Sequence, residues 1–285
     1  MKIGTLQGAL LVFAAFSQAQ TVRGLPGSNP GDRLNQQLLS ERPEAKKSAA
    51  QPRVVVFPGD RVIAQFVDGG TWKTSMYFVN LENHSVSFQV LFFRDDGGDL
   101  SVPVLGQGVV RGLNISLDTA GSIKFETAGI DRNLAQGWAL LSQSTNDSVG
   151  GMAIFGQHVF GAPDQEAVVP IVSQYDNHFV LLFDNAGFTT AIALANPTTN
   201  FVSIPINIRN QAGQIIDQRQ INLDPYSHTA FTLPDTWPST AGRRGAIEFL
   251  TSGFGVGALG LRANGGTFTS FHVLENLNWV NPPPQ

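Results

Sequence analysis

The sequence predicts an all-β protein made of two tandem immunoglobulin-like β-sandwich domains, which follow a signal peptide and a flexible leader. Three observations support this fold class. One segment of the chain occurs twice, apolar and polar residues alternate along several short stretches, and turns rich in Gly and Asp separate those stretches. Alternation with a period of two is typical of a half-buried strand, and several such strands within about 100 residues are typical of a sandwich or a small barrel.

The repeated segment indicates an internal duplication. Residues 68–80 are echoed by residues 184–196, with Phe188 in the place of Trp72 (188 − 72 = 116). The same offset holds without a gap across residues 68–97. An ungapped match of this kind is the signature of a duplicated structural unit.

The later parts of the two copies match with a shorter offset. Leu223 corresponds to Leu117 (223 − 117 = 106), so the second copy lacks about ten residues of the first. The hydrophobic fraction of 42% is large enough for a core in each copy. We therefore expect a first domain over residues 53–173, a second domain over residues 174–279 and a tail over residues 280–285.

The N-terminus has the features of an export signal. Lys2 supplies a positive charge, residues 8–16 form an apolar run, and Ser17 and Ala19 supply small residues for a cleavage site. We expect a signal peptide over residues 1–19, although an uncleaved N-terminal anchor is the alternative. Residues 20–52 are polar, contain four prolines and lack a sustained apolar period, so we expect a flexible leader there.

The expected strands of the two copies follow one pattern. Residues 72–78 and 86–92 alternate between apolar and polar side chains, and residues 202–208 do so in the second copy. Pro205 falls within the last of these strands. Because proline donates no ladder hydrogen bond, we expect that strand to lie at a sheet edge or to contain a bulge at Pro205.

Turns and glycine-rich strands complete the pattern. Turn sequences occur at residues 95–98, 118–121 and 211–213. Each copy then ends in a Gly-rich apolar strand, at residues 150–155 and 257–261.

Composition excludes several classes of function. The net charge is −4, only 14% of residues are charged, and no stripe of Lys and Arg occurs, so we expect no nucleic-acid or anionic-membrane partner. The chain has no Cys, which removes disulfides and thiolate chemistry. After the N-terminal run, no stretch reaches about 18 apolar residues, so we expect no transmembrane segment in the mature chain.

Paired carboxylates and amides recur at equivalent places in the two copies. Asp68 and Asp184 precede Gly-containing turns, where a carboxylate accepts hydrogen bonds from turn N–H groups. Asn80 and Asn196 stand at strand ends, where an amide stabilises the following turn. The alternative is a hydrolase that uses Asp68, Asp184 or Glu166 as an acid/base pair, which requires two carboxyl groups about 5–9 Å apart.

Three carboxylates gather on one expected hairpin. Asp95, Asp96 and Asp99 could supply oxygen ligands to Ca²⁺, which extracellular β-domains often bind weakly. Their spacing differs from an EF-hand loop, and the second copy has no acids in the matching loop. We therefore expect a solvated hairpin tip, with Ca²⁺ binding as the alternative and no other cofactor.

Two aromatic residues are the candidates for ligand binding. Trp72 corresponds to Phe188, which predicts a core position in both copies. Tyr77 lies on the opposite face of the same strand, and Trp237 lies on a loop that only the second copy has. Because loops and exposed aromatics on a rigid scaffold often carry binding functions, we expect Tyr77 and Trp237 to be exposed and to contact a partner.

No motif for catalysis was found. The five histidines are far apart and show no zinc-ligand spacing, and no G-x-S-x-G nucleophile elbow occurs. Residues 255–260 match G-x-G-x-x-G, but no helix is expected after them, so a dinucleotide site is not predicted.

Several stretches resemble an uncharacterised family of exported bacterial proteins with two tandem β-sandwich-like repeats. The resemblance covers most of residues 54–275 and rests on five segments: residues 66–74 with Asn80, 161–170, 183–185, 193–197, and 259–262 with 268–270. It implies secretion and a two-copy β-architecture. No activity is assigned to the family, so it implies no catalytic residues.

These observations predict an exported, non-catalytic scaffold or binding module in the periplasm, at the cell surface or secreted. It would present loops or strand edges to a protein or glycan partner, for example by strand addition. A secreted hydrolase acting on polysaccharide or peptide is the second hypothesis. A structural subunit whose copies stack head to tail is the third.

Overall fold

The computed structural model describes residues 60–143, 147–161, 163–172, 178–251, 255–264 and 267–275. These residues form antiparallel β-sheets, so the predicted all-β sandwich fold is confirmed. The expected signal peptide, leader and tail lie outside the described residues. Within the described ranges, no helix combines the length and the apolar character needed to cross a bilayer.

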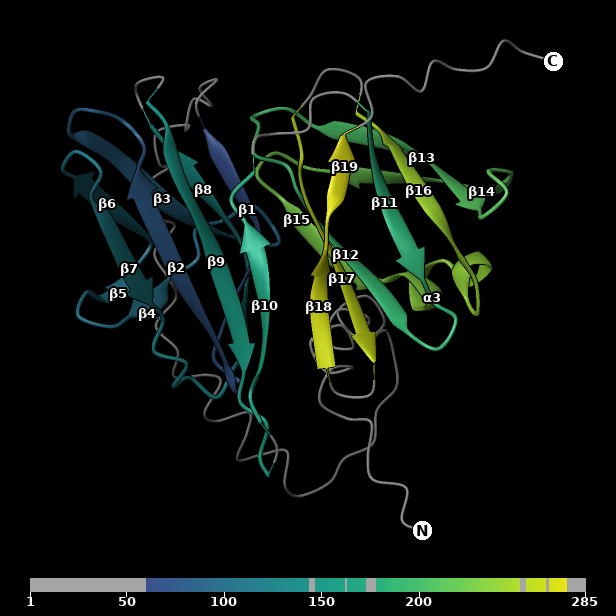
Figure 1. Ribbon diagram of the computed structural model, residues 1–285, viewed down its shortest axis with the longest axis horizontal. Helices are drawn as coiled ribbons and strands as arrows, with labels where there is room; N and C mark the ends of the chain where they lie inside the picture. The colour runs from purple at the N-terminus through teal and green to yellow at the C-terminus, as the bar shows by residue number, and fades with distance from the viewer. Residues whose placement is uncertain are drawn as a thin grey trace, which may run out of the picture.

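The first half of the molecule is a sandwich of two four-stranded sheets (Figure 1, purple to teal). One sheet has the order β1 (Arg61–Asp68), β8 (Ala135–Ser142), β3 (Val86–Arg94), β6 (Gly112–Leu117). The other has the order β10 (Gln165–Pro170), β9 (Val149–Gln157), β2 (Trp72–Asn80), β7 (Ser122–Glu126). A hairpin of β4 (Val102–Val104) and β5 (Gly108–Val110) forms a separate two-stranded sheet, and its Val102 and Val104 side chains are buried in the first core. Phe78 and Phe88 join the sheets, with ring centroids 5.4 Å apart.

The second half is also a sandwich (Figure 1, green to yellow). One sheet has the order β14 (Ile215–Leu223), β13 (Val202–Asn210), β16 (Arg244–Leu250), β11 (His178–Asp184), β19 (Val273–Glu275). The other has the order β15 (His228–Thr232), β12 (Thr189–Ala195), β17 (Gly257–Asn264), β18 (Thr267–Phe271). A short helix, α3 (Leu233–Thr236), and a 3₁₀ turn, Pro238–Thr240, follow β15.

The two halves share one strand order. The strands β1, β8, β3 and β6 occupy the places of β11, β16, β13 and β14, and β10, β9, β2 and β7 occupy those of β18, β17, β12 and β15; β19 is an addition to the second half. This shared order agrees with the sequence match on which the predicted duplication rests.

Asn80 and Asn196 make the same hydrogen bonds in the two halves. The Asn80 amide donates to the carbonyl oxygens of His84, Leu117 and Asp118, at 2.7, 3.3 and 2.9 Å. The Asn196 amide donates to those of Asn200, Leu223 and Asp224, at 2.8, 3.3 and 2.9 Å. The partners reproduce both offsets seen in the sequence, 116 and 106 residues. Their predicted role at strand ends is confirmed.

The connectivity differs from that of an immunoglobulin domain, whose first two strands share a sheet. Here β1 pairs with β8, whereas β2 lies in the other sheet beside β9. Gly69, Gly70 and Thr71 have φ values of 78°, 59° and 84° between these strands. This left-handed backbone turns the chain sharply and directs β2 into the opposite layer.

The prediction that the strand with Pro205 is an edge strand was wrong. β13 lies between β14 and β16, and its register shift falls between Ile208 and Arg209. Proline is tolerated because the pairing with β16 begins only at Ile206, so Pro205 lies beyond the end of that ladder.

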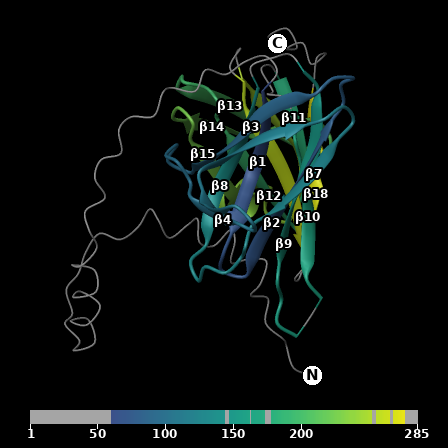
Figure 2. The same ribbon diagram turned by 90° about the vertical axis from the view of Figure 1, so that its left-hand side faces the viewer.

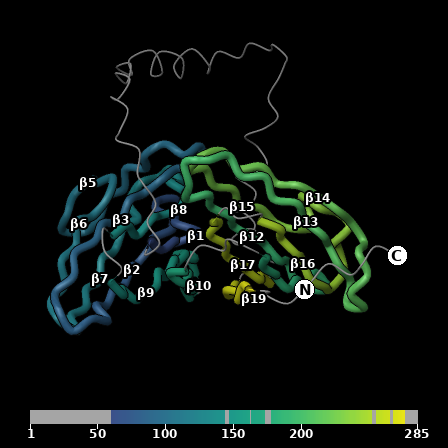
Figure 3. The backbone as a smooth tube through the Cα atoms, turned by 90° about the horizontal axis from the view of Figure 1, so that it is seen from above, coloured from purple at the N-terminus to yellow at the C-terminus, as the bar shows by residue number. Residues whose placement is uncertain are grey.

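The two halves lie side by side and share an apolar interior. Figure 3 shows β1, β8 and β10 next to β15, β12 and β17, and Figure 2 shows the first half in front of the second. Side chains on the outer face of the β15-β12-β17-β18 sheet join the core of the first half. We call this surface the Ala193 face; it comprises Ala191, Ala193, Ala195, Ala230, Leu259 and Leu261. The opposite face of the same sheet covers the second core, so the sheet is buried on both sides.

Candidate functional site

The outer face of the β10-β9-β2-β7 sheet carries Tyr77, which the structure places at the surface as predicted. Tyr77 is 37% exposed, and Met152 and Val168 on the neighbouring strands are 42% and 41% exposed. Tyr77 pairs with Met152 on one side and with Lys124 on the other. We call this surface the Tyr77 face; it comprises Ser75, Tyr77, Val79, Lys124, Met152, Ile154, Glu166, Val168 and Pro170.

Local sequence determines which side chains reach this face. Along β2, buried residues alternate with outward-facing ones, so Trp72 and Met76 point into the core while Tyr77 points out. Gly151 lets β9 lie close to β2, because a Cβ at that position would stand 2.1 Å from the backbone oxygen of Tyr77. The predicted core position of Trp72 is confirmed.

A small group of charged side chains borders the Tyr77 face. Lys73 Nζ lies 3.1 Å from Glu126 Oε1, and Lys124 Nζ hydrogen-bonds the other carboxylate oxygen of Glu126. Lys124 Nζ also lies 5.6 Å from the centroid of the Tyr77 ring. The hydrogen bond from Lys124, reinforced by the one from Lys73, lowers the pKa of Glu126 to about 2. The carboxylate is therefore ionised at neutral pH.

The composition of the Tyr77 face is that of a contact surface. Its centre is apolar, because Met152 and Ile154 on β9 lie between Tyr77 on β2 and Val168 on β10. Its border is charged. A contiguous exposed apolar patch rimmed by polar groups is typical of a site that binds another macromolecule.

The prediction that Trp237 is exposed was wrong. Trp237 is only 5% exposed and belongs to the core of the second half, where its ring meets Phe231 edge-on at 5.0 Å. The loop folds back through α3, and the Trp237 N–H donates to the carbonyl of Leu233 at 2.6 Å. This helical turn directs the indole inward, so Trp237 is unavailable to a surface ligand.

The three carboxylates of the Asp95 hairpin contact three different sets of groups. Asp96 accepts hydrogen bonds from Arg94, at 3.0 and 2.9 Å, and Asp99 lies 3.5 Å from Arg111. Asp95 points elsewhere, toward the second half. In the described part of the chain no group of three or more His, Asp or Glu residues could hold a metal ion. Ca²⁺ binding therefore stays a prediction without a gathered ligand set.

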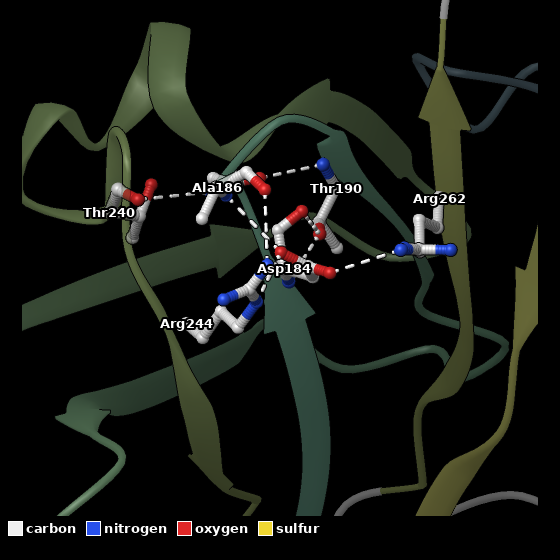
Figure 4. A network of polar contacts seen from close by, with 7 residues as sticks. Asp184, Ala186, Thr190, Thr240, Arg244 and Arg262 are labelled. Atoms are coloured by element: carbon white, nitrogen blue, oxygen red, sulfur yellow. Dashed lines mark hydrogen bonds and ion pairs between the residues drawn. The ribbon is translucent and has the colours of Figure 1, made fainter.

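Asp184 lies at the centre of a polar network at the end of β11 (Figure 4). Arg244 Nε lies 2.9 Å from Asp184 Oδ1, and Arg262 donates to Oδ2 at 3.1 Å. The Ala186 N–H donates to Oδ1 at 3.2 Å, which confirms the predicted turn contact. Burial raises the pKa of Asp184, but the hydrogen bonds from Arg262, Ala186 and Arg244 outweigh it, so the pKa lies below its usual value.

Asn185 and Thr190 hold the turn around Asp184 in place. The Thr190 N–H donates to Asn185 Oδ1 at 2.7 Å, and the Asp184 N–H donates to Thr190 Oγ1 at 2.9 Å. The guanidinium of Arg262 stacks on Phe188, with 3.1 Å between its central carbon and the ring centroid. The contacts of Asp184, Asn185 and Thr190 thus stabilise the turn between β11 and β12.

The other carboxylates proposed for catalysis lie apart from Asp184. Asp68 is buried at the end of β1 in the first half, and its Oδ1 accepts a hydrogen bond from the Gly129 N–H at 2.9 Å. Gly129 belongs to a distant loop, whereas the sequence predicted a donor in the turn that directly follows Asp68. Glu166 is exposed on β10 at the rim of the Tyr77 face.

Two features of the junction between the halves were not predicted from the sequence. The Ala193 face could have been found, because residues 191–195 form a continuous apolar run where the matching strand β2 alternates. Such runs indicate a strand buried on both faces. His228, which is also buried at this junction, had no distinguishing signal in the sequence.

Comparison with known proteins leaves the family open: a scan of protein-family models and a search of curated proteins gave no match to this chain. The resemblance stated above stays a prediction.

Proposed function

We propose that the protein is an exported, non-catalytic β-sandwich module that binds a partner protein through the Tyr77 face. Export follows from the N-terminal residues 1–19, and the binding mode follows from the surface. Tyr77, Met152 and Val168 expose large apolar groups side by side on three neighbouring strands. The proposal replaces the expected contact through loops or strand edges with a contact through a sheet face.

One observation carries this proposal: the equivalent face of the second half is covered. Tyr77 pairs with Met152, and Ala193, which is 116 residues later (193 − 77 = 116), pairs with Leu259. Ala193 and Leu259 are both buried against the first half. The same position in the same strand order therefore docks a β-sandwich in one half and faces solvent in the other.

The composition of the face favours a protein over a glycan as the partner. Around Tyr77 the apolar groups are the aliphatic side chains of Met152, Ile154 and Val168, which suit another apolar protein surface. Tyr77 is the one aromatic residue of the face. Sugar rings are usually held between stacked aromatic rings and paired polar groups.

The carboxylates support a non-catalytic role. Asp184 is paired with two arginines, and Asp68 lies buried in the other half of the molecule. A hydrolase would need a free acid/base pair in one cleft. These contacts favour a structural use for both residues.

The test is affinity capture from an extract of the source cells with the purified chain as bait. The double variant Tyr77→Asp, Met152→Asp places charge on the face without entering the core. The control Val109→Asp, Ile215→Asp makes the same change at two other exposed apolar positions. We expect one or more proteins to be captured by the wild type and the control, and to be reduced at least about tenfold with the Tyr77-face variant.

A glycan array probed with the wild type, the Tyr77-face variant and the control variant tests the alternative that the partner is a glycan. Capture of the same proteins by both variants would contradict the assigned face. Glycan binding that Tyr77→Ala abolishes would keep the face and replace the partner class.

A further inference from the structure

His228 reaches from the second half into the first. It is the first residue of β15, and its side chain has no exposed surface. One ring nitrogen, Nδ1, lies 2.8 Å from Asp95 Oδ1, and the other, Nε2, lies 3.0 Å from the carbonyl oxygen of Ala64. The His228 N–H also donates to the carbonyl of Asp95 at 3.0 Å. Asp95 and Ala64 both belong to the first half, so this residue joins the two halves.

The two acceptors determine where the protons of the imidazole are. A backbone carbonyl can only accept, so the contact with Ala64 is a hydrogen bond only when His228 Nε2 carries a proton. A neutral imidazole carries only one N–H, so it would present a lone pair either to the Ala64 carbonyl or to the Asp95 carboxylate, which is also an acceptor. The arrangement is satisfied when both nitrogens are protonated, which gives an imidazolium paired with a carboxylate.

Asp95 is positioned as an acceptor. Its second oxygen, Oδ2, accepts a hydrogen bond from the Gln136 side-chain amide at 2.8 Å, and its side chain is 44% exposed to solvent. The hairpin that carries it is pressed against the second half, since a Cβ on Gly97 would stand 2.6 Å from the carbonyl oxygen of Pro225. The hairpin tip that was expected to be solvated is therefore docked on its Asp95 side.

Ala64 is a fitting recipient for the second hydrogen bond. It lies on β1, an edge strand, within the register shift between Ile63 and Phe66. On this edge, the carbonyl of Val62 accepts a hydrogen bond from the Val172 N–H. His228 satisfies the carbonyl of Ala64 in the same way, with a side chain in place of a strand.

We propose that His228 is a proton-dependent clamp between the two halves, closed when its imidazolium bridges Asp95 and Ala64. Of the groups seen to contact or pair with His228 in the described ranges, Asp95 carries charge, whereas Ala64 on β1 contributes a carbonyl and Ala195 on β12 is apolar. Gln136 on β8 contacts Asp95 and is neutral.

The clamp opens when either charge is lost. Deprotonation of His228 at higher pH leaves one ring nitrogen as an acceptor that faces another acceptor, either the Asp95 carboxylate or the Ala64 carbonyl. Protonation of Asp95 in acid removes the opposing charge. The junction keeps its uncharged contacts in both cases, because Tyr226 stacks on Phe93 and accepts a hydrogen bond from Trp138 Nε1 at 2.8 Å. The halves therefore loosen at this point without separating.

Nitrogen NMR of the ¹⁵N-histidine-labelled chain tests the protonation state directly. Near neutral pH we expect the His228 resonances, assigned with the His228→Gln variant, to show both ring nitrogens protonated. A signal of an unprotonated ring nitrogen under these conditions, whether Nδ1 or Nε2, would overturn the proposal.

Hydrogen exchange tests the clamping. The protection factor of the segment around His228, corrected for intrinsic exchange, should fall about 10- to 100-fold as the wild-type imidazolium deprotonates. In His228→Gln the protection should already be low and should not change across the same pH range. The control is His158→Gln, because His158 faces Asp164 at the same 2.8 Å but on the exposed surface of the first half.

The His158→Gln control should behave like the wild type. Equal pH dependence in the wild type and in His228→Gln would show that other groups open the junction, and the clamp would be rejected. If His228→Gln failed to fold, the NMR measurement on the wild type would still decide the protonation state.

Discussion

The Tyr77 face and the Ala193 face occupy the same place in the two halves, and only one of them is covered. Both are the outer face of a four-stranded sheet with the same strand order, and both are apolar at the centre. They differ in the size of the central residue, which is tyrosine in the first half and alanine in the second. The comparison teaches that side-chain volume, and not hydrophobicity alone, decides which face can be packed against another sandwich.

The close approach at the Ala193 face explains the small residues there. Gly257 on β17 meets Val62 of β1, and a Cβ on Gly257 would stand 2.3 Å from the Val62 Cγ1 atom. The small side chains of Ala191, Ala193 and Ala195 let the first half pack closely against the rest of this face. The matching positions in β2 are Ser75, Tyr77 and Val79, where no such approach constrains the side chains.

The largest effect is expected from Ala193→Tyr, which gives the buried face the residue of the exposed one. The ring has no space at the junction, so we expect a loss of about 3 kcal/mol in the free energy of unfolding. Urea denaturation measures it. The matched control Tyr77→Ala should cost under about 1 kcal/mol, because Tyr77 is largely outside the core. Similar losses in the two variants would show that the junction between the halves is not maintained in solution.

A smaller effect is expected from Gly257→Ala. The new methyl group meets the buried side chain of Val62, so we expect a loss of about 1–2 kcal/mol in thermal or urea unfolding. Gly150 is the matching position on the Tyr77 face, and a Cβ there would meet the side chains of Leu81 and Val79 at 3.1 and 3.2 Å. Gly150→Ala should therefore change stability much less. A larger loss of stability in Gly150→Ala than in Gly257→Ala would contradict the close contact assigned to the Ala193 face.

The smallest effect is expected from the charged border, which only the Tyr77 face has; Thr232 stands in the place of Glu126 on the second half (232 − 126 = 106). The pKa of Glu126 is lowered from 4.5 to about 2, so its ionised form stabilises the folded state above the unfolded pKa. That contribution is lost as the pH falls from 4.5 toward about 2. Because Lys73 and Lys124 are half exposed, we expect it to be under about 1 kcal/mol and weaker in high salt.

Unfolding of the wild type and of Glu126→Gln as a function of pH measures this contribution. The wild type should lose stability more steeply than Glu126→Gln over the acid range. Parallel curves would mean that the ion pairs around Glu126 contribute nothing measurable.

Local pattern was sufficient for the strands and for several side-chain roles. The alternation in residues 72–78 placed Trp72 inside and Tyr77 outside, and the strand-end positions of Asn80 and Asn196 predicted their turn contacts. Trp237 was mispredicted because its loop has no periodicity, and the helical turn of α3 that buries it forms only against the second core. The connectivity between β1 and β2 was also missed, since a three-residue turn sets strand placement through backbone angles that residue types only partly restrict.

The sequence by itself determined the all-β class, the spacing of the matching segments and the faces of the alternating strands, because each depends on residues close together in the chain. The tertiary structure decided which outer face is covered and which is free. It also brought His228 to Asp95 and Ala64, across separations of 133 and 164 residues. The His228 contacts depend on how two folded sandwiches fit together, and no local pattern along the chain encodes them, whereas the covered face has a local signal in the continuous apolar run of residues 191–195.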